Sequence, residues 1–186
     1  MEQDKRFAVT TADASEIADF SALSEVLRKV REALRMDVVF VSEFANGRRA
    51  FRCVDSAPGE LDVQVGASDP LEESFCQRVV DGRLPSVIHD AMTFSATREL
   101  PATAAVRVGA HLSVPIVLRN GQVFGTLCCF SHHAQPELAE QDAEALSAVA
   151  DMVAAGIDKR GLLRSSLWPD SRSSQTGEAG PASHHA

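Results

Sequence analysis

Cysteine and histidine are the residues of this sequence best suited to nucleophilic or metal chemistry. The four cysteines, Cys53, Cys76, Cys128 and Cys129, are irregularly spaced, which is typical of reduced thiols and not of a disulfide framework. The adjacent Cys128-Cys129 and His132-His133 pairs suggest a metal site at first sight. Neighbouring residues of a strand point to opposite faces, however, so only one member of each pair could face a common site. The sequence therefore predicts no metal site.

Two other groups could support chemistry, and each also has a simpler explanation. Cys76 would become a nucleophile if a cation such as Arg78 lowered the pKa of its thiol, but most buried free cysteines are packing residues. His89-Asp90 resembles part of a phosphohydrolase metal dyad, although the pair ends a short predicted strand and lacks the further ligands. Asp90 is better suited to capping a turn or lining the rim of a pocket.

The chain is acidic, with 18 Lys plus Arg against 26 Asp plus Glu and a formal net charge of −8. This balance argues against a nucleic-acid partner. Arg98 and Arg107 could still bind an anionic ligand beside a pocket, although solvated side chains are the simpler explanation. No apolar run is long enough to span a bilayer, and the first residues lack a signal peptide's apolar stretch. We therefore expect a cytoplasmic protein with no membrane partner.

Composition divides the chain into three segments. Residues 1–12 form an N-terminal extension, and residues 13–160 form a single domain. Residues 161–186 are rich in Ser, Gly, Pro and Ala, so we expect a disordered C-terminal tail.

Hydrophobic periodicity predicts an α+β domain with a helix at each end. Apolar residues three and four positions apart indicate amphipathic helices over residues 19–34 and 136–160. Asn46-Gly47 lies between two runs of β-branched and aromatic residues and predicts a tight hairpin.

The middle of the domain reads as short, irregular elements. Asp69, followed by Pro70 and three residues later by Glu72, predicts a helix over residues 70–81 with Asp69 as its N-cap. The segment PSVIHDA predicts a short strand, and the residues after it predict a weak helix broken near Pro101.

A second predicted hairpin has one apolar face and one mixed face. If Asn120-Gly121 is a two-residue loop, Arg119 pairs with Gln122. The apolar face should then lie under the terminal helices. The other face carries polar groups among hydrophobic ones, as in a small-molecule cavity or in an ordinary core whose polar groups bond to the backbone. Its members are His111, Ser113, Pro115, Val117, Phe124, Thr126, Cys128 and Phe130.

The stretch VGAHLSVPIVLRNGQVFGTLCCFS, followed by LAEQDAEALSAVADMVAA, resembles the closing hairpin and last helix of a GAF domain. The helix opens with an acidic residue, here Asp142, as is typical of that family. The segment PLEESFCQRVVDGRLPSVIHDA is similar to the central helix and short strand of bacterial sensory GAF domains. The resemblance covers about residues 15–160. It implies an antiparallel sheet with the terminal helices on one face and a helix and loop layer enclosing a ligand pocket on the other.

The resemblance also implies a site and a range of functions. It places His111, Ser113, Thr126, Cys128 and Phe130 on the ligand side of the sheet, and Cys76, Asp90 and Arg107 complete the candidate pocket. The Asn-Lys-Phe-Asp-Glu sequence of cyclic-nucleotide GAF domains is absent. Bilin-binding GAF domains attach the chromophore through a Cys followed by His in the segment that here reads TAAVRVGAHL, which has no cysteine. We therefore expect no covalent bilin at the usual position, and the sequence names no other cofactor.

We expect a non-enzymatic sensory or regulatory domain that binds a small molecule in signal transduction. A GAF-fold thiol enzyme similar to free methionine sulfoxide reductase is one alternative, although the four cysteines do not match that family's pattern. Such an enzyme would need a nucleophile near a base, and only the face with Cys128 and His111 offers both. A dimerisation or scaffold module with a vestigial pocket is the other alternative.

The last predicted helix also suggests a partner. Apolar residues spaced four and three apart form a heptad seam, and we expect a second helix to pack against it. That helix could be the first helix of the same chain or belong to a second copy, and we expect a homodimer through the terminal helices. A separate signalling protein is the other possible partner. The seam residues are Ala139, Ala143, Leu146, Ala150, Val153 and Ile157.

Overall fold

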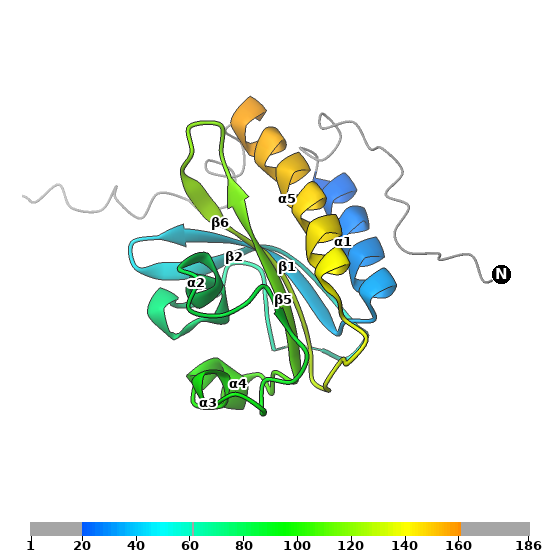
Figure 1. The fold of residues 1–186 in the computed structure, drawn as a ribbon. Helices are drawn as coiled ribbons and strands as arrows, with labels where there is room; N and C mark the ends of the chain where they lie inside the picture. The colour runs from blue at the N-terminus through cyan, green and yellow to red at the C-terminus, as the bar shows by residue number, and fades with distance from the viewer. Residues whose placement is uncertain (1–19, 61, 161–186) are drawn as a thin grey trace, which may run out of the picture.

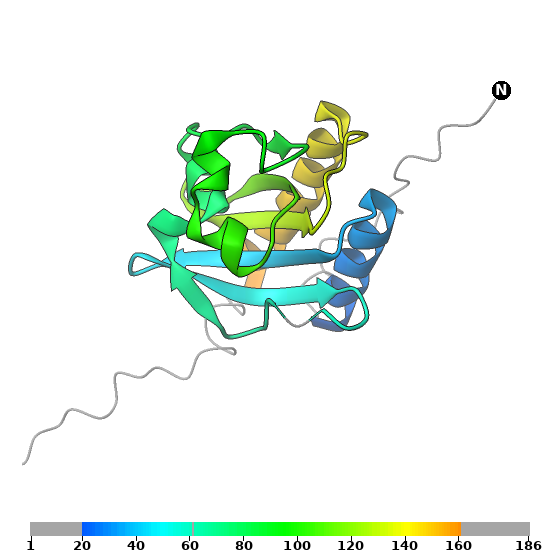
Figure 2. The same ribbon diagram turned by 90° about the horizontal axis from the view of Figure 1, so that it is seen from below.

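The structure is a computed structural model, and it describes residues 20–60 and 62–160. Its centre is a six-stranded antiparallel sheet. The strands lie in the order β3 (Ser68–Pro70), β2 (Arg48–Ser56), β1 (Val38–Ala45), β6 (Val123–Ser131), β5 (Ala110–Val117) and β4 (Val87–Ile88). Two long helices cover one face of this sheet, and short helices lie over the other (Figures 1 and 2). The predicted α+β class and the two-sided arrangement are therefore confirmed. The predicted N-terminal extension and C-terminal tail lie outside the described residues.

The elements in chain order are α1 (Phe20–Leu34), β1 (Val38–Ala45), β2 (Arg48–Ser56), β3 (Ser68–Pro70), η1 (Leu71–Glu73), α2 (Phe75–Val80), β4 (Val87–Ile88), α3 (Ser95–Arg98), α4 (Pro101–Ala105), β5 (Ala110–Val117), β6 (Val123–Ser131) and α5 (Glu140–Arg160).

The terminal helices α1 and α5 lie on the same face of the sheet (Figure 1). Each buries the apolar stripe that its sequence predicts, with Leu27 of α1 and Leu146 of α5 fully buried. Burial of one such side chain contributes about 1.5–3 kcal/mol to folding. The helix α5 begins at Glu140, later than predicted, and the Asp142 carboxylate accepts a hydrogen bond from the Ala139 N–H just before it. None of the described helices is long and apolar enough to cross a membrane.

The heptad-seam residues that lie within α5 are covered within one chain. Ala150, Val153 and Ile157 are 1%, 1% and 4% exposed, and they belong to the same buried cluster as residues of α1 and the sheet. The seam therefore needs no second copy to hide it. Homodimerisation through these helices stays a prediction.

The first hairpin has the tight turn that its sequence predicts. Asn46 and Gly47 have φ values of +54° and +70°, and Ala45 pairs with Arg48 across the turn. Both turn residues are left-handed, as a tight two-residue hairpin requires. The register shifts between Val41 and Ser42, and this bulge sets the direction of the strand residues that follow.

The second hairpin has the predicted pairing along most of its length, including Ser113 with Cys128, but differs at its loop end. Val117 pairs with Val123 and not with Phe124, and the Leu118 N–H donates to the Gln122 carbonyl. Only Gly121 in this turn has a left-handed φ, +81°. A two-residue type I′ loop needs two such residues, so the chain adopts a longer loop followed by a bulge. As a result Phe124 packs under the terminal helices, whereas the two-residue register placed it on the opposite face.

The segment predicted as one helix over residues 70–81 is divided. Asp69 lies in β3, which pairs with β2, and a turn of 3-10 helix follows it. The helix α2 begins only after Ser74, whose hydroxyl accepts a hydrogen bond from the Gln77 N–H at 3.1 Å. Ser74 is therefore the N-cap, and the prediction that Asp69 has this role is wrong. A tertiary contact overrides the local helix signal, because the Asp69 carboxylate accepts a hydrogen bond from Arg49 of the neighbouring strand.

The sheet separates two buried clusters. The face under α1 and α5 carries Val39, Leu112, Leu127 and Cys129. The opposite face, called the cavity face below, carries Phe40, Cys128 and Phe130. Cys128 and Cys129 thus point to opposite faces, as the alternation of a strand requires.

Candidate functional site

A cavity of about 310 Å³ lies between the cavity face of the sheet and the layer that contains α2 and α4. Four phenylalanines from different parts of the chain form its apolar walls, and Arg49, His111 and Cys128 are its buried polar groups. Three carboxylates, those of Asp62, Asp69 and Glu73, complete the polar lining. The full lining is Phe40, Arg49, Phe51, Asp62, Val63, Ala67, Ser68, Asp69, Glu73, Phe75, Pro101, Ala102, Ala105, Val106, Val108, His111, Cys128 and Phe130.

Arg49 is the buried cation of this cavity. Its side chain is 8% exposed, and two of its nitrogens donate to the two carboxylate oxygens of Asp69. The guanidinium carbon lies 5.4 Å from the ring centre of Phe40 and 4.9 Å from that of Phe51. Burial acts to lower the pKa of Arg49, but the charges of Cys76 and Asp69 raise it above its ordinary value. The charge is therefore held in place by a fork of hydrogen bonds between two aromatic rings.

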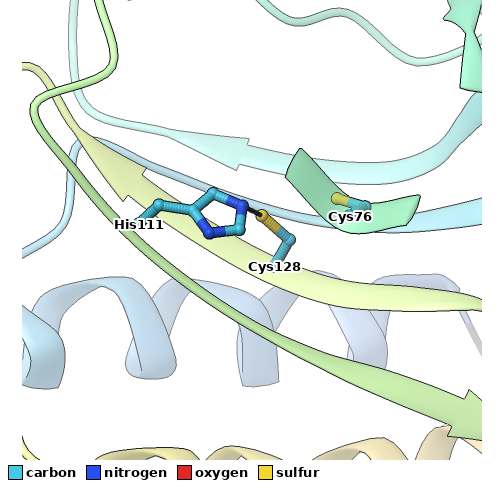
Figure 3. Close-up of side chains that lie close together, drawn as sticks. All are labelled: Cys76, His111 and Cys128. Atoms are coloured by element: carbon cyan, nitrogen blue, oxygen red, sulfur yellow. Dashed lines mark hydrogen bonds between the residues drawn. The ribbon is translucent and has the colours of Figure 1, made fainter. Parts of the chain in front are cut away.

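Arg49 also contacts a cluster of Cys76, His111 and Cys128, which come from α2, β5 and β6 (Figure 3). The Arg49 Nη1 donates to the Cys76 Sγ at 3.0 Å, and the Cys128 Sγ lies 3.1 Å from the His111 Nε2. The two sulfurs and a ring nitrogen of His111 all lie within 4.8 Å of one another. All three residues are buried.

The two thiols of the cluster have opposite pKa shifts. Burial acts to raise the pKa of Cys76, but the hydrogen bond from Cys128 and the charge of Arg49 hold it well below its usual range. Burial and the neighbouring Cys76 raise the pKa of Cys128 well above its usual range. One thiolate, on Cys76, is therefore the form that the site favours, because the single guanidinium beside it compensates one negative charge.

His111 is fixed by packing as well as by polar contact. The Phe75 ring lies over the imidazole at 4.8 Å between ring centres. The imidazole Nδ1 is buried and has no hydrogen-bond partner among the described residues. A buried polar atom without a partner costs about 1–3 kcal/mol, so a bound ligand that satisfied it would stabilise the domain.

The predicted site residues divide into two groups. The structure places His111, Cys128 and Phe130 on the cavity wall. Cys76 contacts Arg49, which lines the cavity, but is itself outside the lining. Ser113 and Thr126 are fully buried and also outside the lining, and the Thr126 hydroxyl lies 3.0 Å from that of Ser42.

Two further predicted site residues lie away from the cavity lining. Asp90 caps a turn by accepting a hydrogen bond from the Met92 N–H at 2.9 Å. Arg107 is exposed, with φ +49°, and its carbonyl lies 3.2 Å from the His132 Nδ1. Neither residue is part of the pocket that was predicted for it.

Sequence reasoning missed Arg49 and Asp69. The cation near Cys76 was predicted to be Arg78, a near neighbour in sequence, and the structure supplies Arg49 from another strand instead. The available signal was the alternation of β2, since Arg49 and Phe51 lie on the same face of a strand with period two. No spacing in the sequence connects that strand with Cys76.

His132 and Glu60 form a second polar contact that yields a pH prediction. Their Nε2 and Oε2 atoms are 2.7 Å apart. Burial acts to lower the pKa of His132, but this hydrogen bond, the contact with the Arg107 carbonyl and the charges of Glu60 and Asp37 together raise it above its ordinary value. A raised pKa in the folded state stabilises the fold at low pH, and this contribution is lost as pH rises through the raised value. We expect His132→Gln to cost about 0.5–1 kcal/mol near pH 5.5 and almost nothing near pH 8.5. Urea unfolding at both pH values measures this, with His133→Gln at the exposed neighbouring position as control; an equal loss at both values would contradict it.

Comparison with known proteins places this geometry in a family. A family model described as GAF domain matches residues 21–157. No curated protein sequence matches the chain. Among solved structures, the phycocyanobilin-bound GAF domain of a cyanobacterial phytochrome has a TM-score of 0.61 at 16% identity, covering 75% of this chain and 84% of that one. The GAF domain of Acinetobacter phosphoenolpyruvate-protein phosphotransferase has a TM-score of 0.59 at 18% identity, with 75% and 82% covered.

An enzyme with the same fold is as similar to this chain, by TM-score, as these GAF domains are. Free methionine-R-sulfoxide reductase from Neisseria meningitidis, solved with its substrate, has a TM-score of 0.61 at 14% identity, covering 80% of this chain and 85% of that one. These three structures differ in chemistry, so their likeness to this chain is one of fold alone. The match of the family model over most of the domain, together with the six-stranded sheet between a helix pair and a cavity, shows that the chain belongs to the GAF domain family.

Proposed function

We propose that this GAF domain is a non-enzymatic sensory or regulatory module that binds a small organic ligand in the cavity between the sheet and α4. The observation that carries the proposal is the cavity itself. Its walls are mostly apolar and include four phenylalanines, and it holds a buried guanidinium and a buried imidazole in fixed positions. Concave, mostly apolar sites with a few convergent polar groups are the usual form of small-molecule sites.

The lining supports a particular chemical class of ligand. A volume of about 310 Å³ is near the lower end of the range for small-molecule pockets, which favours a compact molecule. The walls formed by Phe40, Phe51 and Phe75 suit a planar or apolar body. The lining contains three carboxylates and one guanidinium, and that guanidinium is already paired with Asp69. A neutral or cationic ligand is therefore favoured over an anion.

A bulky residue on α4 tests the proposal. Ala102 lines the cavity, and we expect Ala102→Phe to fill it and to weaken ligand binding at least tenfold. The measurement is a thermal-shift screen of the wild-type protein with compact neutral and cationic aromatic compounds, repeated on the variant. A ligand at a hundred times its Kd stabilises the folded state by about 2.7 kcal/mol.

The matched control is Ala104→Phe, at an exposed position of the same helix outside the cavity lining. This variant should respond to the same compounds as the wild-type protein. Compounds that stabilise Ala102→Phe as strongly as the wild type would show that they bind elsewhere and would contradict the proposal.

A thiol enzyme is the second candidate, favoured by the cluster of Cys76, His111 and Cys128. Against it, Cys76 holds the low-pKa thiol but is not part of the cavity lining. Cys128 does line the cavity, but the pKa of its thiol is raised, which makes it a poor nucleophile near neutral pH.

We therefore expect no thiol-dependent turnover. Purified protein supplied with a dithiol reductant should reduce neither free methionine sulfoxide nor a hydroperoxide above the level of Cys76→Ser. Turnover that disappears in Cys76→Ser or Cys128→Ser would establish the enzyme instead.

A further inference from the structure

We propose that Cys76, His111 and Cys128 form a binding site for a single thiophilic divalent metal ion, with Zn²⁺ as the best match. Two thiolates and one imidazole are a ligand set that zinc uses in proteins when a fourth position is left open. Figure 3 shows the two cysteine side chains and the imidazole converging from three different elements. The proposal does not depend on an organic ligand in the cavity.

The spacing of the three donor atoms fits one metal ion. The Cys128 Sγ and the His111 Nε2 are 3.1 Å apart, and all three donor atoms lie within 4.8 Å of one another. Zinc binds sulfur at about 2.3 Å and nitrogen at about 2.0–2.1 Å, so tetrahedral ligand atoms are roughly 3.5–3.8 Å apart. The observed 3.1 Å separation is shorter than this spacing and the 4.8 Å limit is longer, so the observed separations bracket the spacing that one ion requires.

The backbone that carries the donors is well fixed. Ser113 pairs with Cys128 across β5 and β6, and His111 lies two residues before Ser113, on the same face. Cys76 lies on α2, which packs on β5 and β6. Phe75, the residue before it, holds the imidazole plane. A site whose ligands stand on packed strands and a helix keeps its geometry without the metal.

A divalent ion would balance the charge of its own ligands. It would displace the thiol protons of Cys76 and Cys128, and the two thiolates would then place two negative charges among residues that are all buried. Arg49 donates to the Cys76 Sγ, but Asp69 already pairs with that guanidinium. A divalent ion would neutralise both thiolates, and the Arg49 N–H would remain as an outer hydrogen bond to a ligand sulfur, a common feature of metal–thiolate sites.

The fourth coordination position would face the cavity. Cys128 and His111 line the cavity, while Cys76 is not part of the lining. Water or a donor atom of a cavity ligand could occupy that position. The remaining cysteines, Cys53 and Cys129, lie in the cluster under the terminal helices and cannot join the site.

Cobalt spectroscopy tests the proposal on the wild-type chain. The protein is reduced, washed with a chelator and titrated with Co²⁺ without oxygen. We expect saturation at one equivalent, with a thiolate-to-cobalt charge-transfer band and visible bands of tetrahedral intensity, both removed by Zn²⁺. The absence of charge transfer, or only the weak bands of octahedral cobalt, would overturn the proposal, because the thiols would not be ligands.

Variants assign the ligands. Cys76→Ser and Cys128→Ser should each weaken Zn²⁺ binding at least about a hundredfold, more than loss of an outer partner typically does. Cys129→Ala, the neighbouring thiol on the opposite face, and Cys53→Ala should bind as the wild type does. Unchanged affinity in a folded Cys128→Ser, or an equal loss in Cys129→Ala, would overturn the assignment. If a serine variant does not fold, the wild-type charge-transfer intensity, which should correspond to two thiolates, decides the matter.

Discussion

Replacing Arg49 with methionine should destabilise the domain by about 3 kcal/mol and raise the pKa of the Cys76 thiol. The side chain is 8% exposed and donates hydrogen bonds to Asp69 and to the Cys76 Sγ. Methionine fills much of the same volume but leaves the carboxylate and the thiolate without their cation. Removing one partner of a buried ion pair typically costs 3–5 kcal/mol, and the loss here is at the lower end because Asp69 is 36% exposed.

The preceding residue provides a matched control for Arg49→Met. Arg48 is exposed and hydrogen-bonds to Ser68, at 2.8 Å from its Nε to the hydroxyl. Arg48→Met should change the free energy of unfolding by no more than about 0.5 kcal/mol. Urea unfolding gives the stabilities, and ultraviolet thiolate absorbance against pH gives the Cys76 titration. Equal stability of the two variants, or an unchanged titration in Arg49→Met, would show that Arg49 does not hold the site together.

Gly125→Ala should destabilise the domain by about 3 kcal/mol or more. A Cβ at this position would lie 1.9 Å from the Ser42 carbonyl oxygen and 3.0 Å from the Glu43 Cα, both backbone atoms of β1. Backbone of a central strand cannot move aside as a flexible side chain can, so overpacking here costs at least as much as in a tight core. The strands β1 and β6 would separate next to the bulge at Phe124.

Gly121→Ala separates this steric effect from a dihedral one. Gly121 has φ +81° and nothing within 4 Å of its Cβ position. Its replacement should therefore cost only the left-handed penalty of about 1–2 kcal/mol. Denaturant midpoints for the two variants measure the difference. A Gly125→Ala variant no less stable than Gly121→Ala would contradict the close approach of β1 and β6.

Local patterns were sufficient to predict the frame of the fold. The apolar stripe of α1 and the Asn46-Gly47 turn are decided within a few residues, and both have the predicted form. The start of α2 was wrong for a tertiary reason. The Asp-Pro pattern at Asp69 is a good helix start. Asp69 instead pairs with Arg49 as part of β3 and forms a salt bridge with it, so the helix begins later. In the second hairpin only the loop end was predicted wrongly, because Asn-Gly also suits a longer loop with a bulge. The predicted pairing of His111 with Phe130 and of Ser113 with Cys128 is confirmed.

The polar centre of the site could not be predicted from spacing. His111 and Cys128 were placed on one face by hairpin register, which a two-strand pattern determines. Cys76 lies beside them only because α2 packs on β5 and β6. Arg49 lies on β2, in the other half of the sheet. Contacts between distant segments depend on the packing of whole layers, and no local pattern of residues encodes them.

Native mass spectrometry tests most directly whether the cavity binds a small molecule. Wild-type protein, Ala102→Phe and Ala104→Phe are incubated with the small-molecule fraction of a cell extract, exchanged into volatile buffer and weighed intact. The wild type and Ala104→Phe should carry the same noncovalent adduct, released on denaturation, and Ala102→Phe should carry none. An adduct shared equally by all three proteins, or by none, would contradict a ligand-binding cavity at this site.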